Sequence, residues 1–144
     1  MYTDGYNARR AMSHYQQMST HAEVGDASPH RLVQMMLDAA LARVTAARGA
    51  LDAGETARKG ELIGKAIGLI EGLRVSLDHE RGGEIATNLG ALYDYFGRRL
   101  LEANLRNDGA VLDEVADLLR EIGTGWSALG EALPQAATAP RPRV

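Results

Sequence analysis

The sequence predicts an all-α protein, an antiparallel up-down-up-down four-helix bundle with an N-terminal arm or short helix. Three observations lead to this fold class. Apolar residues recur every three or four positions through four segments, which is the period of an α-helix. Glycine, proline or Asn-Asp turns join these segments, and short connections between long helices favour antiparallel neighbours. No segment alternates apolar and polar residues as a half-buried strand does.

The first predicted helix begins at Ser28 and Pro29. A serine side chain accepts a hydrogen bond from the first turn, and proline suits the next position because its missing N–H is not needed there. Gly54 is expected to end this helix, since glycine readily adopts the left-handed conformation of a helix C-terminus. The inward positions are Val33, Leu37, Ala40, Val44, Ala47 and Leu51, and Leu32, Met36 and Leu41 widen the apolar arc at the flanks.

The second helix is predicted over residues 56–79, which places His79 at its C-terminal end. Gly82 and Gly83 then break the chain, because two consecutive glycines make helix continuation costly. The inward positions are Ile63, Ile67, Ile70, Leu73 and Leu77 in the second helix, and Ile85, Leu89, Leu92, Phe96, Leu100 and Ala103 in the third.

The fourth helix is predicted to follow Asn107, with Asp108 as its capping residue and Pro134 as its stop. Its inward stripe is Val111, Val115, Leu118, Ile122, Trp126, Leu129 and Leu133. These boundaries divide the chain into an arm over residues 1–27, a bundle over 28–133 and a disordered tail over 134–144, which is rich in alanine, proline and arginine.

Some apolar surface exceeds what the bundle needs. Leu62 and Leu69 extend one flank of the second helix beyond its inward set. Leu101 and Leu105 form an i, i+4 pair that points away from the bundle centre. Tyr93, by contrast, is expected to cover a core edge with its hydroxyl in water, like Tyr95 on the other side of the third helix.

The second helix also carries a glycine at every fourth position. The row comprises Gly60, Gly64, Gly68 and Gly72. Each glycine costs about 1 kcal/mol relative to alanine within a helix. Two interpretations stay open: close packing within the bundle, or a shallow groove that lets the backbone of another helix approach.

The composition argues against catalysis and against a metal or cofactor site. The chain of 144 residues has 24% charged residues and a net charge of -3, so it lacks the basic surface of a nucleic-acid-binding protein. It has no cysteine, and its histidines do not have the spacing of metal ligands. It has neither a signal peptide nor an apolar run long enough to span a membrane. We expect a non-enzymatic binding protein of the cytoplasm, without membrane insertion, cofactor or metal.

Short blocks in a fixed order suggest a family. They are Tyr15-Gln16, Ala27-Ser28-Pro29, Leu32-Val33-Gln34-Met35, Gly82-Gly83-Glu84-Ile85-Ala86, Leu92-Tyr93-Asp94-Tyr95, Arg98-Arg99-Leu100, Asn107-Asp108 and Trp126. Over residues 12–133 the chain resembles the FliS family, the flagellin-specific export chaperones of bacterial flagella. Where this family often has Met-Leu-Tyr-Asp-Gly, the chain has Met35-Met36-Leu37-Asp38-Ala39, so contacts of that tyrosine and glycine are not carried over.

The resemblance implies a helical bundle that binds the disordered C-terminal region of flagellin in the bacterial cytosol. It would keep flagellin from polymerising early and help deliver it to the flagellar type III export gate. The predicted client-binding residues are Tyr15, Leu62, Gly64, Leu69, Tyr93, Leu101 and Leu105. The N-terminal arm could occupy the client groove of the free protein, and its removal would then raise client affinity or expose the protein to self-association.

Two other functions are open to a bundle of this size. A histidine phosphotransfer protein needs an exposed histidine in the middle of a helix. Here His79 is predicted at a helix end beside Glu80, and His30 is predicted in an exposed first turn without a role. A purely structural bundle would dimerise through the apolar surface of its second helix.

Overall fold

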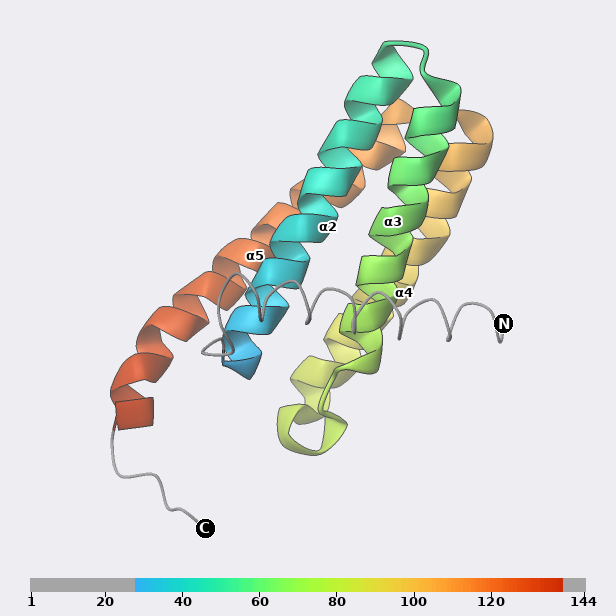
Figure 1. Ribbon diagram of the computed structural model, residues 1–144. Coiled ribbons are helices and arrows are strands. Elements are labelled where there is room, and N and C mark those ends of the chain that lie inside the picture. The colour runs from blue at the N-terminus through green and yellow to red at the C-terminus, as the bar shows by residue number, and fades with distance from the viewer. Residues whose placement is uncertain (1–27, 139–144) are drawn as a thin grey trace.

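The computed structural model describes residues 28–138, with side chains as far as Gly130, and forms a four-helix bundle (Figure 1). Its helices are α2 (Pro29–Asp52), α3 (Thr56–Val75), α4 (His79–Arg106) and α5 (Gly109–Thr138). They run alternately up and down, and α2 and α4 each pack against both α3 and α5. The predicted all-α, up-down-up-down bundle is confirmed.

Local signals set several helix ends as predicted. The Ser28 side chain accepts a hydrogen bond from the backbone N–H of Arg31 at 3.1 Å and caps α2. Gly54 follows this helix with a φ of 74°. Asn107 ends α4 in the left-handed conformation, with φ 53° and ψ 47°. The Asp108 carboxylate then accepts hydrogen bonds from two N–H groups of the first turn of α5, at 3.1 and 3.3 Å.

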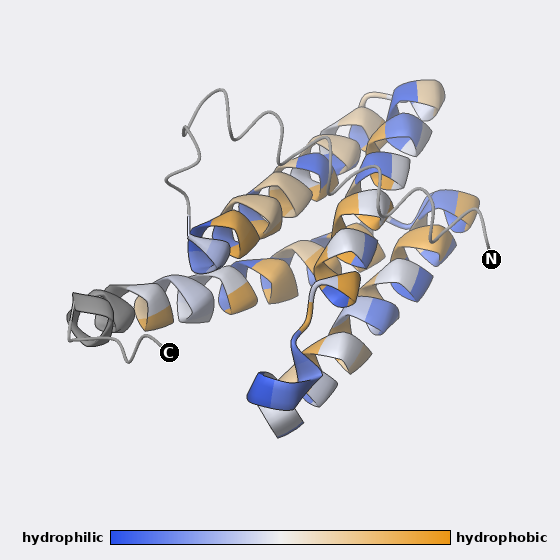
Figure 2. Cartoon of the chain, turned by 60° about the horizontal axis from the view of Figure 1, so that its bottom comes forward, coloured by the Kyte–Doolittle hydropathy of each residue, from blue (hydrophilic) through white to orange (hydrophobic). Residues whose placement is uncertain are grey.

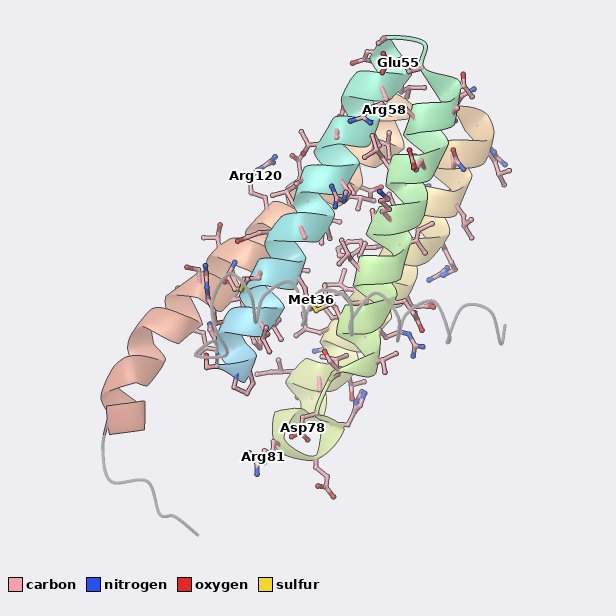
Figure 3. The ribbon with its side chains drawn as sticks, in the orientation of Figure 1. Met36, Glu55, Arg58, Asp78, Arg81 and Arg120 are labelled. Atoms are coloured by element: carbon pink, nitrogen blue, oxygen red, sulfur yellow. The ribbon has the colours of Figure 1, made fainter. Side chains whose placement is uncertain are left out.

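The predicted boundary between the second and third helices is wrong. α3 ends at Val75, and Asp78 caps α4 by accepting a hydrogen bond from the N–H of Arg81 at 3.1 Å (Figure 3). His79 is therefore the first residue of α4 and not the end of α3. Gly83 has non-helical angles, with a φ of 52° and a ψ of -125°, so the predicted break at Gly82-Gly83 is present as a kink that separates the first turn of α4 from the rest of the helix.

The prediction that Pro134 stops the last helix is also wrong, because α5 continues to Thr138. Proline removes one N–H donor, but its φ is that of a helix. A single proline near the end of a helix of 30 residues therefore weakens the last turns without ending them. The predicted arm over 1–27 and the rest of the predicted tail, residues 139–144, lie outside the described residues.

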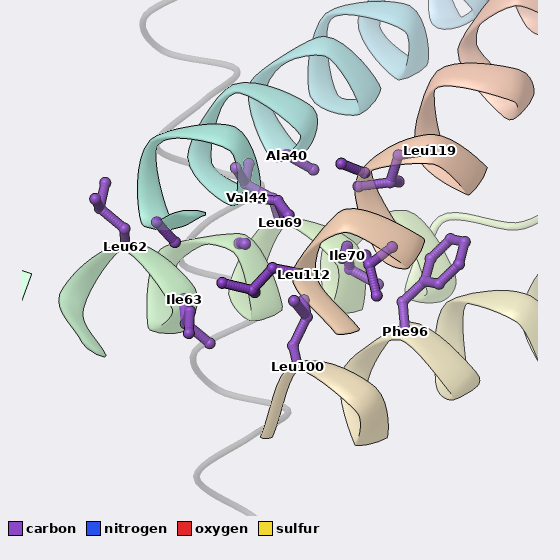
Figure 4. Close-up of a cluster of buried hydrophobic side chains, with 14 of the residues drawn as sticks. Ala40, Val44, Leu62, Ile63, Leu69, Ile70, Phe96, Leu100, Leu112 and Leu119 are labelled. Carbon is purple, nitrogen blue, oxygen red and sulfur yellow. The ribbon is translucent and has the colours of Figure 1, made fainter. Parts of the chain in front are cut away.

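The core lies between all four helices (Figure 4). Its largest fully buried side chains include Phe96, Met36, Leu37, Ile63, Ile70, Leu73, Leu100, Leu112 and Leu119. Met36, expected at a flank, is buried among them. The face of α2 that meets this core carries the small residues Ala40, Ala47 and Ala50, and small residues let a neighbouring helix approach closely. A close approach covers more of the flank of α2 than the apolar arc alone predicts.

Candidate functional site

Two predicted site residues lie on the outside of α4. Leu101 is 55% exposed and Leu105 is 82% exposed, and they stand one turn apart on the same face. On this face one turn earlier, the Arg98 side chain pairs with Asp94 at 3.3 Å. The prediction that this leucine pair points away from the bundle centre is confirmed.

Gly64 of α3 lies at about the same level along the bundle as Leu101 of α4. The Nζ of Lys59 donates to the backbone oxygen of Asn104 at 3.0 Å, which places the first turn of α3 against the last turns of α4. The helices are antiparallel, so the next turn of α3 brings Gly64 level with Leu101. Gly64 is exposed, and a Cβ at this position would meet no atom of a neighbouring element within 4 Å. We call Gly64, Leu101 and Leu105 the outer face.

The other two predicted leucines are inside the bundle. Leu62 is 5% exposed and Leu69 is 8% exposed, and both belong to the buried cluster (Figure 4). The expectation that they widen the outward apolar surface of α3 is wrong. They join the core on the side where α3 packs against α2, whose small side chains leave room for long leucines.

Of the two predicted tyrosines, the structure describes Tyr93 and not Tyr15. Tyr93 is buried in the core and does not cover its edge, so the expected exposed position is wrong. Burial raises the pKa of its phenol to about 12. Tyr15 lies outside the described residues.

Sequence reasoning assigned the apolar stripe at the start of α4 to the core, and the structure leaves part of it exposed. Ile85 is 69% exposed although it was predicted to point inward, and Leu89 and Leu92 are only partly buried. They continue the face of Phe96 toward the N-terminus of α4. We call Ile85, Leu89 and Leu92 the lower stripe.

Among the described residues, α5 leaves the lower stripe uncovered in part because it diverges from α4. Within the described residues, the buried side chains of α5 end at Leu119. Beyond that point its hydrogen bonds to other helices go to α2: Gln34 donates to the backbone oxygen of Gly123 at 3.4 Å, and Trp126 donates to that of His30 at 2.9 Å. Figures 1 and 2 both show the C-terminal part of α5 running away from the start of α4. No signal in the sequence marks this divergence, because Ile122, Trp126 and Leu129 continue the apolar stripe of α5 beyond Leu119.

A polar cluster fixes α4 to α5 just above this opening. The Tyr95 hydroxyl donates to one oxygen of Glu114 at 2.6 Å, and Arg99 donates to the other at 3.0 Å. Arg99 also pairs with Glu102 at 2.7 Å. The hydrogen bonds from Tyr95 and Arg99 lower the pKa of the Glu114 carboxyl, and the bond to Glu114 raises the pKa of Tyr95.

The described side chains offer binding surface and no grouped metal ligands. No three His, Asp or Glu side chains among them come together as a metal site. Within residues 28–138, none of the helices combines the length and the apolarity of a membrane span.

Comparison with known proteins identifies the family. A family profile described as "Flagellar protein FliS" matches residues 11–133. The flagellar secretion chaperone FliSB of Pseudomonas aeruginosa is 52% identical over 122 residues, which cover 85% of this chain and 97% of that protein. The flagellar secretion chaperones FliS of Salmonella typhimurium and Bacillus subtilis are 50% and 34% identical, each over 78% of this chain and over 84% and 80% of their own lengths. This chain therefore belongs to the FliS family of flagellar proteins.

Proposed function

We propose that this protein is a cytosolic export chaperone that binds the disordered C-terminal region of flagellin. It prevents premature polymerisation of this client and assists its delivery to the flagellar type III export apparatus. The names of the relatives support a role in flagellar secretion. The single structural observation that carries the proposal is the exposure of Leu101 and Leu105, a leucine pair that the bundle itself does not cover.

A disordered client must fold on these leucines to bind them well. An amphipathic helix presents apolar side chains at i, i+3, i+4 and i+7, and these fit a row of exposed leucines. Fully burying a leucine side chain contributes about 1.5–3 kcal/mol. Ordering a disordered segment costs about 2–5 kcal/mol or more, so the outer face and the lower stripe together provide enough anchors to offset that cost.

Calorimetric titration with a flagellin C-terminal fragment tests the proposal. The double variant Leu101→Glu/Leu105→Glu places two charges on the outer face without disturbing the core. We expect it to lower affinity at least about tenfold, a loss of about 1.4 kcal/mol, with an unchanged thermal melt. The matched control is Val75→Glu, because Val75 is 50% exposed at the end of α3 and lies outside both surfaces. Wild-type affinity in the double variant would remove the outer face from the binding site.

The two alternative functions predict different results. A dimerising bundle needs exposed apolar surface on α3, but Leu62 and Leu69 are buried. Light scattering of the free protein checks this alternative. A phosphotransfer protein needs a mid-helix histidine, whereas the two described histidines, His30 and His79, lie in the first turns of α2 and α4. Incubation with a phosphodonor followed by Phos-tag electrophoresis checks that one.

A further inference from the structure

The far half of α5, residues 120–130, is held by α2 at a contact centred on one histidine. The rings of His30 and Trp126 stack with centroids 4.7 Å apart and planes 5° from parallel. The Trp126 indole N–H also donates to the backbone oxygen of His30 at 2.9 Å. A Cβ added to Gly130 would lie 2.2 Å from the His30 Nε2, so only a glycine leaves room for the ring. We call His30, Trp126 and Gly130 the latch.

Around the latch, the contact between α2 and α5 includes buried polar atoms that lack hydrogen-bond partners. The His30 Nε2 and the Gln34 Oε1 are the buried side-chain polar atoms of the described residues that lack a hydrogen-bond partner. Both belong to α2, in its two turns nearest the far half of α5. A cleft of about 540 Å³ also lies along this seam, between Gln34 and Leu41 of α2 and Gly123, Thr124 and Ser127 of α5. Figure 3 shows Arg120, another residue of the cleft lining, projecting beside α2. Unpaired polar atoms and unfilled space are features of contacts that open locally, so the far half of α5 is attached to α2 at few points.

The far half of α5 has an apolar side. Ile122 is partly buried and Leu129 is exposed, and both continue the stripe by which α5 enters the core. On α4, the lower stripe continues the face of Phe96, which enters the core. If α5 stayed beside α4 beyond Leu119, these two sides would cover each other and remove apolar surface from water.

We propose that the latch is a positioning device for client binding: by holding the far half of α5 on α2, it keeps the lower stripe of α4 open for an apolar helix of the client. This inference rests on the proposed function. Because α5 does not cover the lower stripe, the client must provide a helix face with apolar side chains at helical spacing. The latch therefore does not contact the client. It sets the position of α5, and the client binds to the lower stripe.

The chain offers a matched pair of glycines to test the latch. Gly130→Ala drives a methyl group into the His30 ring, whereas a Cβ on Gly125, in the same helix, meets no neighbouring element within 4 Å. We expect Gly130→Ala to weaken binding of a flagellin C-terminal fragment about tenfold, because about one molecule in ten would keep the lower stripe open. Gly125→Ala should bind as the wild type does.

Trp126 reports the latch independently of the client, since it is the single tryptophan of the chain. Loss of the stack and of the indole hydrogen bond should change both the intensity and the wavelength of its emission in Gly130→Ala but not in Gly125→Ala. His30→Leu removes the stacking ring but keeps the backbone oxygen that accepts the indole hydrogen bond, and it tests the stack separately if Gly130→Ala does not fold, as judged by circular dichroism.

The outcomes separate the latch from the proposed function. If the wild type binds the fragment and the folded Gly130→Ala and His30→Leu variants bind it equally well, the latch has no positioning role. Unchanged Trp126 emission in Gly130→Ala would also overturn the inference, because the stack with the His30 ring would have survived the added methyl group. If the wild type itself does not bind the fragment, the proposed function fails first.

Discussion

Replacing Lys59 by methionine tests whether a buried ammonium group holds α3 to the end of α4. Lys59 is 3% exposed, and its Nζ donates to the backbone oxygen of Asn104 and to the side-chain oxygen of Asn107. Both acceptors lie at the C-terminal end of α4, where carbonyl groups lack helical donors and the helix dipole favours a cation. Methionine keeps an unbranched apolar stem but donates no hydrogen bond.

The expected loss of stability is about 2 kcal/mol, since leaving a buried acceptor without a donor costs about 1–3 kcal/mol. Asn107 is exposed, so water replaces the ammonium group there and this second bond adds little. Removing the ammonium also removes the cost of its burial, which offsets part of the loss at Asn104. For a chain of this length, such a change lowers the Tm by roughly 4–8 °C.

Urea unfolding followed by circular dichroism at 222 nm measures this loss. The midpoint should fall while the slope m stays the same, because the surface exposed on unfolding does not change. The control is Lys65→Met, an exposed lysine on the same helix, which should change stability by less than about 0.5 kcal/mol. A Lys59→Met variant as stable as the wild type would show that the burial cost of the ammonium cancels its hydrogen bonds, and the reasoning would be refuted.

Two further predictions concern the core and the cluster between α4 and α5. Phe96→Ala should cost about 3–5 kcal/mol in the same urea titration because Phe96 is fully buried, while Leu129→Ala should change little because Leu129 is exposed. The lowered pKa of Glu114 stabilises the folded state above the ordinary value of 4.5, and this contribution is lost as the pH falls through the folded-state pKa. Thermal melts of the wild type should therefore lose stability below pH 4.5 more steeply than those of Glu114→Gln, and parallel pH profiles would contradict this role.

Helix ends that depend on residues close to one another in the sequence could be predicted. Ser28 and Asp108 cap their helices through hydrogen bonds to residues two or three positions away, and Asn107 ends α4 through its own backbone conformation. Pro134 failed as a stop because a proline weakens a helix without forbidding it. The predicted break at Gly82 and Gly83 is present as a kink at Gly83, but Asp78 caps one further turn before it, so α4 begins earlier than predicted.

The candidate site could be predicted only in part, because contacts between helices decide which apolar side chains stay exposed. Leu101 points outward because the opposite face of α4 supplies the core. Leu62 occupies an equally plain apolar flank, yet it is buried because the neighbouring helix carries small residues there. The lower stripe depends on where α5 goes after Leu119, and that depends on the hydrogen bond between Trp126 and His30, 96 residues apart. Apolar periodicity along one helix carries no information about a partner at that separation.

The order of packing in this bundle also bears on how the chain folds. α2 with α3, α3 with α4, and α4 with α5 are neighbours both in sequence and in space, and among these described helices only the contact of α2 with α5 joins distant parts of the chain. Proteins rich in such near-neighbour contacts cross their folding barrier in microseconds to milliseconds. Closing the ring between the first and last helices carries the largest loop entropy, so we expect this pairing to form late and to be the first lost on unfolding.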